Sequence, residues 1–391
     1  MNSNQVLNSS DPQKTTRPDV FIAGGGPAGL ACAIAAAQRG LTVEVADGMK
    51  PPIDKACGEG LMPDTIAALA DLGIDLTSIE SAPFRGIRFL NADSSGAPVS
   101  AQAAFPAAAG RGLRRTLLHQ LLLDRATALG VHFNWQTVVQ EIQEIQSQQG
   151  TASQRSLVRT NRHTVHPRFI IGADGNQSRV RTCASLDRVS YSSQRIGLRQ
   201  HFQIESPPDF VEVHWSKHGQ AYVTPVSPHE ICVAFVASTK IPTIQSALTH
   251  YPQLQRRLHS ATATDTPRGS VTLNRKLHRV TRGNVALIGD ASGSVDAVTG
   301  EGLGLAFHQA LALAEALRGG NLASYQQAHR AIQRRPYFMG RAMLLMDASP
   351  GLRNLTLHLF QRQPRLFERL LRFHIGHNPH IPLHTTPIPV S

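Results

Sequence analysis

Residues 20–30 run from an apolar strand into a glycine-rich turn and then into an alanine-rich helix, and this combination strongly constrains the fold. The turn fits the pattern GxGxxG. Its first glycine permits a tight bend, its second lets backbone N–H groups approach a pyrophosphate, and its third lets helix and strand pack closely. The positive end of the helix then faces the phosphates. The pattern predicts a dinucleotide site that includes Gly24, Gly26, Ala28 and Gly29.

An acidic residue follows at the expected place. Residues 41–47 form a predicted strand that ends at Asp47, eighteen positions after Gly29. A ribose-binding carboxylate is expected roughly 20 residues further on in such folds. We therefore assign Asp47 to a ribose hydroxyl. A glycine turn that binds nothing is the alternative, and the flanking strand, helix and acid argue against it.

Two later stretches carry a family resemblance. Residues 172–181, GADGNQSRVR, resemble the ADGxxSxVR signature of flavoprotein monooxygenases of the para-hydroxybenzoate hydroxylase type. Residues 284–291 are similar to the distal GD motif of that superfamily, and residues 299–304 open the helix that follows. Together with the glycine-rich turn at residues 20–30, these stretches make three motifs that occur in the same order as in the family. The resemblance implies that the bound dinucleotide is FAD, with NADH or NADPH as the electron donor.

The resemblance also implies where FAD is held. Asp290 is expected to bond ribityl hydroxyls, and Arg115 resembles the family arginine that contacts the cofactor, with Arg114 as the alternative. Asp174 and Arg181 are expected near the pyrophosphate, or else in a turn and on a solvated helix face. Reduced flavin is an anion, so a helix N-terminus at its edge would stabilise it. The remaining cofactor contacts are assigned to Val139, Gly300, Gly302 and Leu303.

Residues 55–63 resemble the Cys-Gly segment of geranylgeranyl reductase-like flavoproteins. In those relatives the segment lies close to the flavin ring, which implies a catalytic contact of Cys57 and neutralisation of flavin or phosphate by Lys55. An inert thiol in a tight loop is the alternative, because the reactivity of a cysteine depends on its pKa. Glu301 lies in a TGEG loop shared with the same branch. Two roles remain open for it, a proton donor and a carboxylate that caps the following helix.

Composition narrows the class of protein. The 391 residues are 41% hydrophobic and 17% charged, which is an ordinary globular balance. The four cysteines are far apart without paired spacing, which argues against a disulfide framework and against a metal site. No apolar run reaches the length of a membrane span, and the polar N-terminus lacks the apolar region of a signal peptide. We expect a cytoplasmic protein.

The net charge of +12 is the unusual part of the composition. The arginines are scattered, and no nucleic-acid-binding motif accompanies them, so we expect no nucleic-acid partner. A solvated basic surface is the simplest explanation. The alternative is that arginines receive NADPH phosphates, a lipid headgroup, or an anionic or carrier-bound substrate.

The predicted fold class is α/β. A Rossmann-type FAD-binding domain with a parallel sheet is interleaved with a mostly antiparallel β substrate domain, and a helical segment follows. We assign residues 19–84, 106–183 and 271–335 to the FAD-binding domain, 85–105 and 184–270 to the substrate domain, and 336–391 to the helical segment, after a disordered leader at 1–18.

Local patterns give finer expectations. The antiparallel sheet should cover the flavin, and His214, Trp215 and Tyr222 are candidates for its substrate pocket, with plain core packing as the alternative. The C-terminal helices should break at three prolines, Pro336, Pro350 and Pro364. Residues 366–373 are amphipathic and basic. For them we favour packing on the body of the protein over contact with a membrane.

The leading functional interpretation is an NAD(P)H-dependent monooxygenase that oxygenates a hydrophobic small molecule through a flavin C4a-hydroperoxide. A histidine and prolines usual after the distal GDA of the aromatic hydroxylases are missing, which weakens hydroxylation with a mobile flavin. The second interpretation is a geranylgeranyl reductase-like enzyme that reduces C=C bonds. A non-catalytic flavin-binding scaffold is the third.

Overall fold

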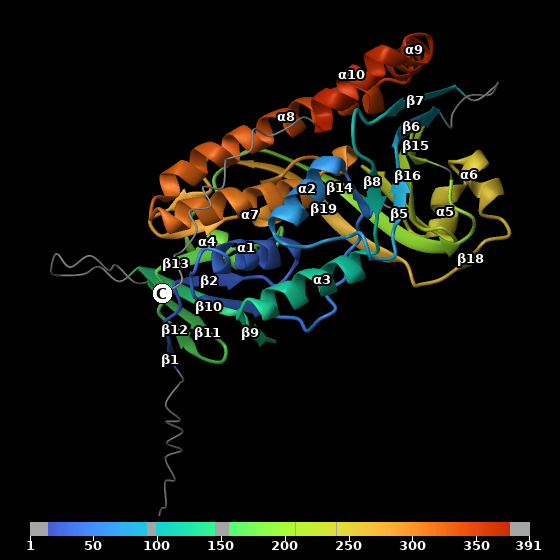
Figure 1. The fold of residues 1–391 in the computed structure, drawn as a ribbon. Coiled ribbons are helices and arrows are strands. Elements are labelled where there is room, and N and C mark those ends of the chain that lie inside the picture. Colours follow the sequence, from blue (N-terminus) through green and yellow to red (C-terminus); the bar gives the residue numbers. More distant parts are fainter. Residues whose placement is uncertain (1–14, 92–98, 145–155, 208, 240, 376–391) are drawn as a thin grey trace, which may run out of the picture.

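A computed structural model describes residues 15–91, 99–144, 156–207, 209–239 and 241–375 (Figure 1). The predicted leader falls mostly outside this part of the chain. Thr15–Thr16 forms the short strand β1, so the prediction of disorder is wrong for these two residues. They pair with β12 in parallel.

The first large sheet is a parallel sheet with one antiparallel edge strand. Its order is β20-β21-β13-β2-β3-β9. The strands are β20 (Thr281–Arg282), β21 (Val285–Leu287), β13 (Phe169–Gly172), β2 (Val20–Ala23), β3 (Val43–Asp47) and β9 (His132–Trp135). The two central strands, β2 and β13, are buried along their whole length, as expected for a sheet covered on both faces.

Helices cover this sheet and complete its hydrophobic core. α1 (Pro27–Ala37) links β2 to β3 and packs against both α3 (Arg115–Ala128) and α7 (Gly302–Arg318). The small residues of α1 allow this close approach, and nine of its residues are buried. The short helices α2 (Pro63–Asp71) and α4 (Arg179–Cys183) lie beside α7 and β10 respectively.

The second large sheet is mostly antiparallel, with the order β22-β19-β14-β17-β16-β15-β6-β7 and with β18 paired to β14. Among the strand pairs of this sheet that the structure describes, β15–β6 is the parallel one. In chain order the strands are β6 (Gly86–Asn91), β7 (Ser100–Ala104), β14 (Val189–Gln203), β15 (Phe210–Ser216), β16 (Gly219–Ser227), β17 (Glu230–Ala237), β18 (Thr262–Ala263), β19 (Arg268–Leu277) and β22 (Gly293–Ser294). Helices α5 (Ile244–Leu248) and α6 (Pro252–Arg257) form a small core with this sheet.

Two minor sheets and two short helices connect these parts. One sheet consists of β1, β12 (Thr164–Val165), β11 (Ser156–Thr160) and β10 (Val139–Glu144), and the other of β4 (Gly60–Leu61), β8 (Gly110–Gly112) and β5 (Ala82–Phe84). The 3-10 helices η1 (Gly289–Ser292) and η2 (Ala297–Thr299) precede α7. The predicted fold class, a parallel FAD-binding sheet with an antiparallel second sheet, is confirmed.

Three C-terminal helices lie along one side of the molecule, α8 (Leu322–Ala348), α9 (Pro350–Arg362) and α10 (Pro364–Ile375) (Figure 1). Breaks at Pro350 and Pro364 are confirmed, because each proline is the first residue of a new helix. The predicted break at Pro336 is wrong, since α8 continues through this buried proline. A proline inside a helix costs about 3 kcal/mol, and packing of α8 on α7, η2 and α9 outweighs that cost.

Candidate functional site

The three sequence motifs meet at the carboxyl ends of the parallel strands. The backbone N–H of Ala173 donates to the Ala23 carbonyl at 2.7 Å, and that of Ile288 donates to the Gly172 carbonyl at 2.9 Å. Residues far apart in the chain thus form one edge of the site. This is where ligands bind in open α/β sheets.

Arg181 ties two of these motifs together. Its side chain is buried and donates to the Asn176 carbonyl at 2.8 Å and to the Ala291 carbonyl at 3.1 Å. Asp187 accepts from its Nε at 2.9 Å. The alternative in which Arg181 lies on a solvated helix face is therefore wrong. Its guanidinium stabilises the junction between the two loops.

A cavity of about 980 Å³ extends from this junction, between the two large sheets, to the C-terminal helices. Both predicted catalytic residues, Cys57 and Glu301, line it. Of the predicted cofactor-binding residues, those that line it are Gly24, Gly26, Ala28, Asp47, Lys55, Arg115, Val139, Asp174, Asp290, Gly300, Gly302 and Leu303. Gly29 is the exception, because it lies beneath the turn between helix and strand.

The glycines show that the cavity suits a dinucleotide. A Cβ on Gly26, Gly300 or Gly302 would meet no atom within 4 Å, so these backbones are open to a ligand. Gly24 has a φ of +111°, which a residue with a side chain rarely adopts, and a Cβ on Gly29 would lie 1.8 Å from the Gly24 carbonyl. Gly24 therefore forms the turn, Gly26 leaves room for a ligand, and Gly29 lets the helix pack closely on the strand. α1 and α7 both begin at the cavity without a side-chain cap, which leaves their first N–H groups for phosphate and flavin.

The acidic residues of the motifs are held by backbone groups and by Lys55. Asp47 accepts from the N–H groups of Gly25 and Met49, each at 2.7 Å, which fixes its carboxylate at the end of β3. Asp174 accepts from the N–H of Arg179 at 2.7 Å, while its second oxygen is buried without a partner. Lys55 donates to Asp290 at 2.8 Å across the cavity.

The structure distinguishes the two neighbouring arginines. Arg114 is held outside the cavity by Glu230, which accepts from its Nε at 2.6 Å. Arg115 begins α3, lines the cavity, and has a buried Nε without a hydrogen-bond partner. Arg115 is therefore available to a ligand, which agrees with the role that the resemblance implied. Arg114 is not available, because its side chain is bound to Glu230.

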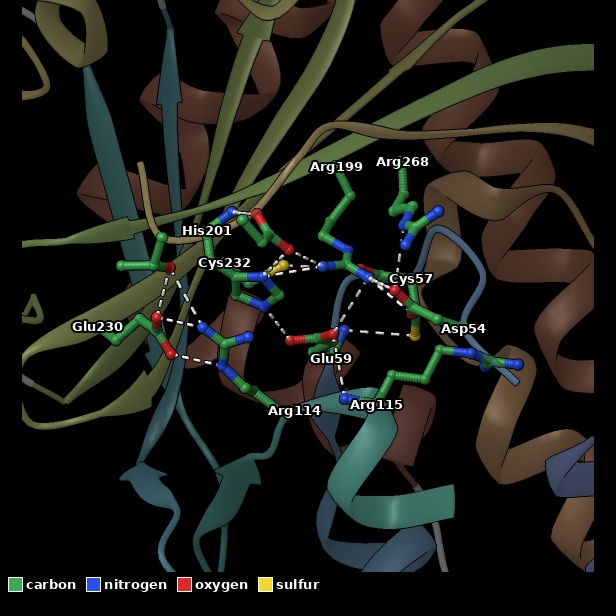
Figure 2. Close-up of polar contacts among 12 residues, drawn as sticks. Asp54, Cys57, Glu59, Arg114, Arg115, Arg199, His201, Glu230, Cys232 and Arg268 are labelled. Carbon is green, nitrogen blue, oxygen red and sulfur yellow. Dashed lines mark hydrogen bonds and ion pairs between the residues drawn. The ribbon is translucent and has the colours of Figure 1, made fainter. Parts of the chain in front are cut away.

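A buried network of charges at the cavity wall was not predicted. Figure 2 shows Glu59 at its centre, between His201 and Arg115. One carboxylate oxygen accepts from the Arg115 backbone N–H at 3.1 Å, and the other lies 2.6 Å from His201 Nε2. The opposite ring nitrogen of His201 lies 2.8 Å from Asp265. Glu59 has a φ of +58°, so this network holds the segment at Cys57 in a conformation rare outside glycine.

Charge balance explains the protonation of this network. Burial acts to lower the pKa of His201, but its hydrogen bonds to the carboxylates of Glu59 and Asp265 raise it overall. Arg199 adds a second buried positive charge and donates to Asp54 at 2.7 Å. The sequence offered one signal for these residues, because Arg199 and His201 are two positions apart and so share one face of a strand.

Among the described residues, Glu59, His201 and Cys232 offer ligand atoms within 4.8 Å of one another. A metal ion would have to enter beside the Arg199 guanidinium, which lies 3.9 Å from Glu59 and 2.8 Å from the His201 ring. The carboxylates already neutralise these cations. We therefore interpret the group as an ion-pair network.

Cys57 lines the cavity, and its sulfur accepts from the backbone N–H of Glu59 at 3.4 Å. Burial raises the pKa of the thiol, although the Arg115 charge acts against this. A thiol with a raised pKa keeps its proton at neutral pH, and the thiolate is the reactive form. The electrostatics thus favour the inert alternative for Cys57.

Glu301 precedes α7, but its side chain does not cap the helix, so that alternative is wrong. Burial raises the pKa of its carboxyl to about 8, and the Asp64 carboxylate acts in the same direction. Its Oε1 lies 3.7 Å from Nδ1 of His374, and its Oε2 is buried without a partner. Burial also lowers the pKa of His374 to about 4. The cavity wall thus carries a protonated carboxyl beside a neutral imidazole.

Of the three candidates for the substrate pocket, one lines the cavity and two do not. Tyr222 lines the cavity and donates to the Val298 carbonyl at 2.6 Å. Trp215 is wholly buried and packs edge-on against Phe89, and His214 is buried beside Glu212. Neither of these two lines the cavity, although Val211 and Val213 of the same strand do.

Those helices supply the outer part of the cavity, which the sequence did not reveal. α8, α9 and α10 contribute an apolar lining that includes Met343, Met346, Leu352, Phe360 and Leu371. Helical periodicity could have indicated an inward stripe. It could not have shown that the stripe would face a cavity.

The chain matches the FAD binding domain family over residues 17–331. It belongs to that family. The chain is therefore a flavoprotein of an FAD-dependent oxidoreductase family, as its three motifs predicted. FAD binding fits the convergent glycines and the two uncapped helix ends at the cavity.

Proteins similar to this chain are named for more than one reaction. It is 27% identical over 351 residues to a menaquinone reductase of Mycolicibacterium smegmatis, covering 83% of this chain and 82% of the relative. It is also 27% identical over 341 residues to the ubiquinone hydroxylase UbiL of Rhodospirillum rubrum, covering 80% and 77%. The p-nitrophenol 4-monooxygenase PnpA of Pseudomonas putida shares the fold, with a TM-score of 0.76, 18% identity, and coverage of 93% and 98%.

Proposed function

We propose that the chain takes electrons from NADH or NADPH onto FAD and reduces a carbon–carbon double bond of a hydrophobic substrate. The observation that carries this proposal is Glu301, whose buried carboxyl lines the cavity and has a pKa of about 8. Reduction of a double bond adds a hydride to one carbon and a proton to the other. A carboxyl that is protonated at neutral pH supplies the proton.

The roles divide between cofactor and protein. Bound FAD would supply hydride transfer between the nicotinamide and the substrate, and the open backbones of Gly26, Gly300 and Gly302 would help to hold it. Glu301 donates its proton to the second carbon and regains one from solvent between turnovers. The start of α7, with Gly300 and Gly302 open to the cavity, stabilises negative charge on the flavin edge. His374, held neutral by burial, adds no positive charge that would stabilise the carboxylate of Glu301.

The lining of the cavity supports a lipophilic substrate. Its outer part is apolar, with Ile87, Val213, Met346 and Phe360 on the wall. Two relatives are named for menaquinone and ubiquinone, which are quinones with isoprenoid tails. We propose a substrate with such a tail. The expectation of an anionic or carrier-bound substrate stays a prediction.

Hydroxylation is the second candidate, and the similarity to the ubiquinone hydroxylase over 341 residues favours it. Oxygen separates the two reactions. The FAD-loaded protein is incubated with NADPH and an isoprenoid quinone, with and without air, and the product is examined by mass spectrometry. Gain of two hydrogen atoms without air that persists after mild reoxidation of any hydroquinone to the quinone supports reduction of the double bond. Gain of one oxygen atom, with matching oxygen uptake, contradicts it and supports hydroxylation.

Glu301→Gln tests the proton donor. We expect turnover to fall by about 10²- to 10⁴-fold, because the amide cannot donate an acidic proton, while FAD stays bound. In the unaltered enzyme, turnover should decline as pH rises through about 8, where Glu301 loses its proton. Steady-state rates across this range, with flavin absorbance for occupancy, measure both effects.

The matched control is Glu80→Gln, since Glu80 is exposed and does not line the cavity. It should leave both the rate and its pH dependence unchanged. A Glu301→Gln variant with normal turnover and the same alkaline decline would show that the proton comes from elsewhere.

A further inference from the structure

We propose that the outer faces of α8, α9 and α10 form a surface that docks on an anionic lipid bilayer, with the mouth of the cavity opening at that surface. The three helices lie together along one side of the molecule (Figure 1). Among the described residues, no helix combines the length and apolar character that a membrane crossing needs. The inferred contact is therefore with the bilayer surface.

Exposed apolar side chains gather on these helices. Of the eleven large apolar side chains exposed in the described part of the chain, seven lie here, so they form a patch. On α9, Leu352, Leu355 and Leu359 repeat at helical spacing, and Leu355 is 67% exposed. The other members are Phe338, Leu345, Leu366 and Phe373, and the Phe338 and Phe373 rings lie 5.9 Å apart.

Packing on the protein does not account for this outer face. A separate, inward stripe already buries Leu357, Phe360, Phe367 and Leu371 in the core beneath the helices. The Phe367 ring lies 4.9 Å from that of Phe89 on the underlying sheet. The preference for packing over membrane contact therefore applies to the inner stripe. The outer stripe has no such partner among the residues that the structure describes.

Charge favours an anionic bilayer as the occupant. Between residues 336 and 375 the exposed charged side chains are Glu368 and five arginines, Arg341, Arg362, Arg365, Arg369 and Arg372. Basic residues around an apolar helix face attract anionic lipid. A second copy of the chain is a poorer occupant, because a symmetric contact would bring the same arginines together.

The patch continues into the cavity. Phe338, Leu345 and Leu352 line the cavity and are also exposed to solvent, so they form the rim of a mouth between α8 and α9. A substrate with an apolar tail could pass from the bilayer into the cavity without crossing water. This route rests on the proposed function. The docking itself does not.

Vesicle binding tests the surface. The FAD-loaded protein is mixed with vesicles of phosphatidylcholine alone or with phosphatidylglycerol added, and the bound fraction is measured by flotation. We expect binding to the anionic vesicles that weakens with salt. The double variant Leu355→Gln/Leu359→Gln should lower the partition coefficient by about tenfold or more, since each leucine loses apolar burial. Neither residue lines the cavity.

The leucine variant has a matched control, and a second variant tests the arginines against a control of its own. Val189→Gln/Val271→Gln alters exposed apolar residues on the second sheet and should bind vesicles normally. Arg365→Gln/Arg369→Gln should weaken binding to anionic vesicles, whereas Arg188→Gln/Arg256→Gln, elsewhere on the exposed surface, should have a smaller effect.

Three outcomes would overturn the proposal: no binding of the unaltered protein to anionic vesicles, equal losses in variants and controls, or a dimer in sedimentation that the leucine variant dissociates without any vesicle binding. An enzyme that binds vesicles as expected but reduces no substrate would support the docking surface and contradict the proposed function.

Discussion

At the level of single residues, burial decides which groups on the cavity wall carry protons. It raises the pKa of both the Cys57 thiol and the Glu301 carboxyl, and it lowers that of His374. The same physical cause thus has opposite consequences. It makes a carboxyl into an acid useful at neutral pH and makes a thiol unreactive.

Alkylation tests the state of the thiol. Iodoacetamide should modify the exposed Cys183 at least about tenfold faster than Cys57, because the Cys57 thiol is only partly exposed and its raised pKa keeps it mostly protonated. Peptide mass spectrometry over time gives the two rates. Cys57→Ala should keep FAD and turn over normally. Faster labelling of Cys57, slowed by FAD, would instead indicate a thiolate beside the flavin.

At the level of elements, one strand of the second sheet holds a loop of the FAD site. Arg199 and His201 project from β14 to the carboxylates of Asp54 and Glu59. These two acids flank Cys57, and Glu59 also accepts from the first N–H of α3. The two sheets are therefore joined by buried charge as well as by apolar packing.

The network predicts a pH-dependent stability. The pKa of His201 is raised in the folded protein, so its ion pairs contribute fully below the unfolded value of about 6.5 and lose their contribution as pH rises through the folded value. His201→Gln should lower the free energy of unfolding by about 3 kcal/mol at pH 6 and remove this dependence.

Urea unfolding of the FAD-loaded protein between pH 6 and 9 measures both effects. His229→Gln, on an exposed turn, is the control and should behave like the unaltered protein. If stability were to increase with pH over this range in the unaltered protein but not in His201→Gln, His201 would be neutral in the fold and the ion-pair interpretation would fail.

At the level of the whole molecule, FAD binding depends on three motifs that lie far apart in the chain. Their backbones are joined by β-sheet hydrogen bonds and by Arg181. A ligand that binds only the folded state stabilises it by mass action. FAD should therefore raise the melting temperature of the entire protein.

Two glycine variants separate binding from folding. Gly26→Val should fold, since its side chain enters open space, but should weaken FAD binding by at least about tenfold. Gly29→Val should lose about 1–3 kcal/mol of stability, because its Cβ would overlap the Gly24 carbonyl. Thermal melting with and without FAD, and flavin fluorescence titration, distinguish them. Equal FAD affinity in Gly26→Val would show that the cofactor lies elsewhere.

The sequence by itself determined the FAD-binding family and the local geometry of the motifs. Glycine positions, strand ends and helix starts are properties of short segments, so the sequence alone assigns separate roles to Gly24, Gly26 and Gly29. The same holds for the helix starts at Pro350 and Pro364, where proline lacks the N–H that a continuing helix needs.

Only the tertiary structure decided what depends on neighbours distant in the chain. Packing on α7 stabilises α8 across Pro336. The side chain of Arg114 binds Glu230 outside the cavity, whereas Arg115 lines the cavity wall. The charge states of Glu301 and His201 depend on burial and on partners from other elements. Both burial and long-range ion pairs arise only when the chain is folded, and this is why no local pattern contained them.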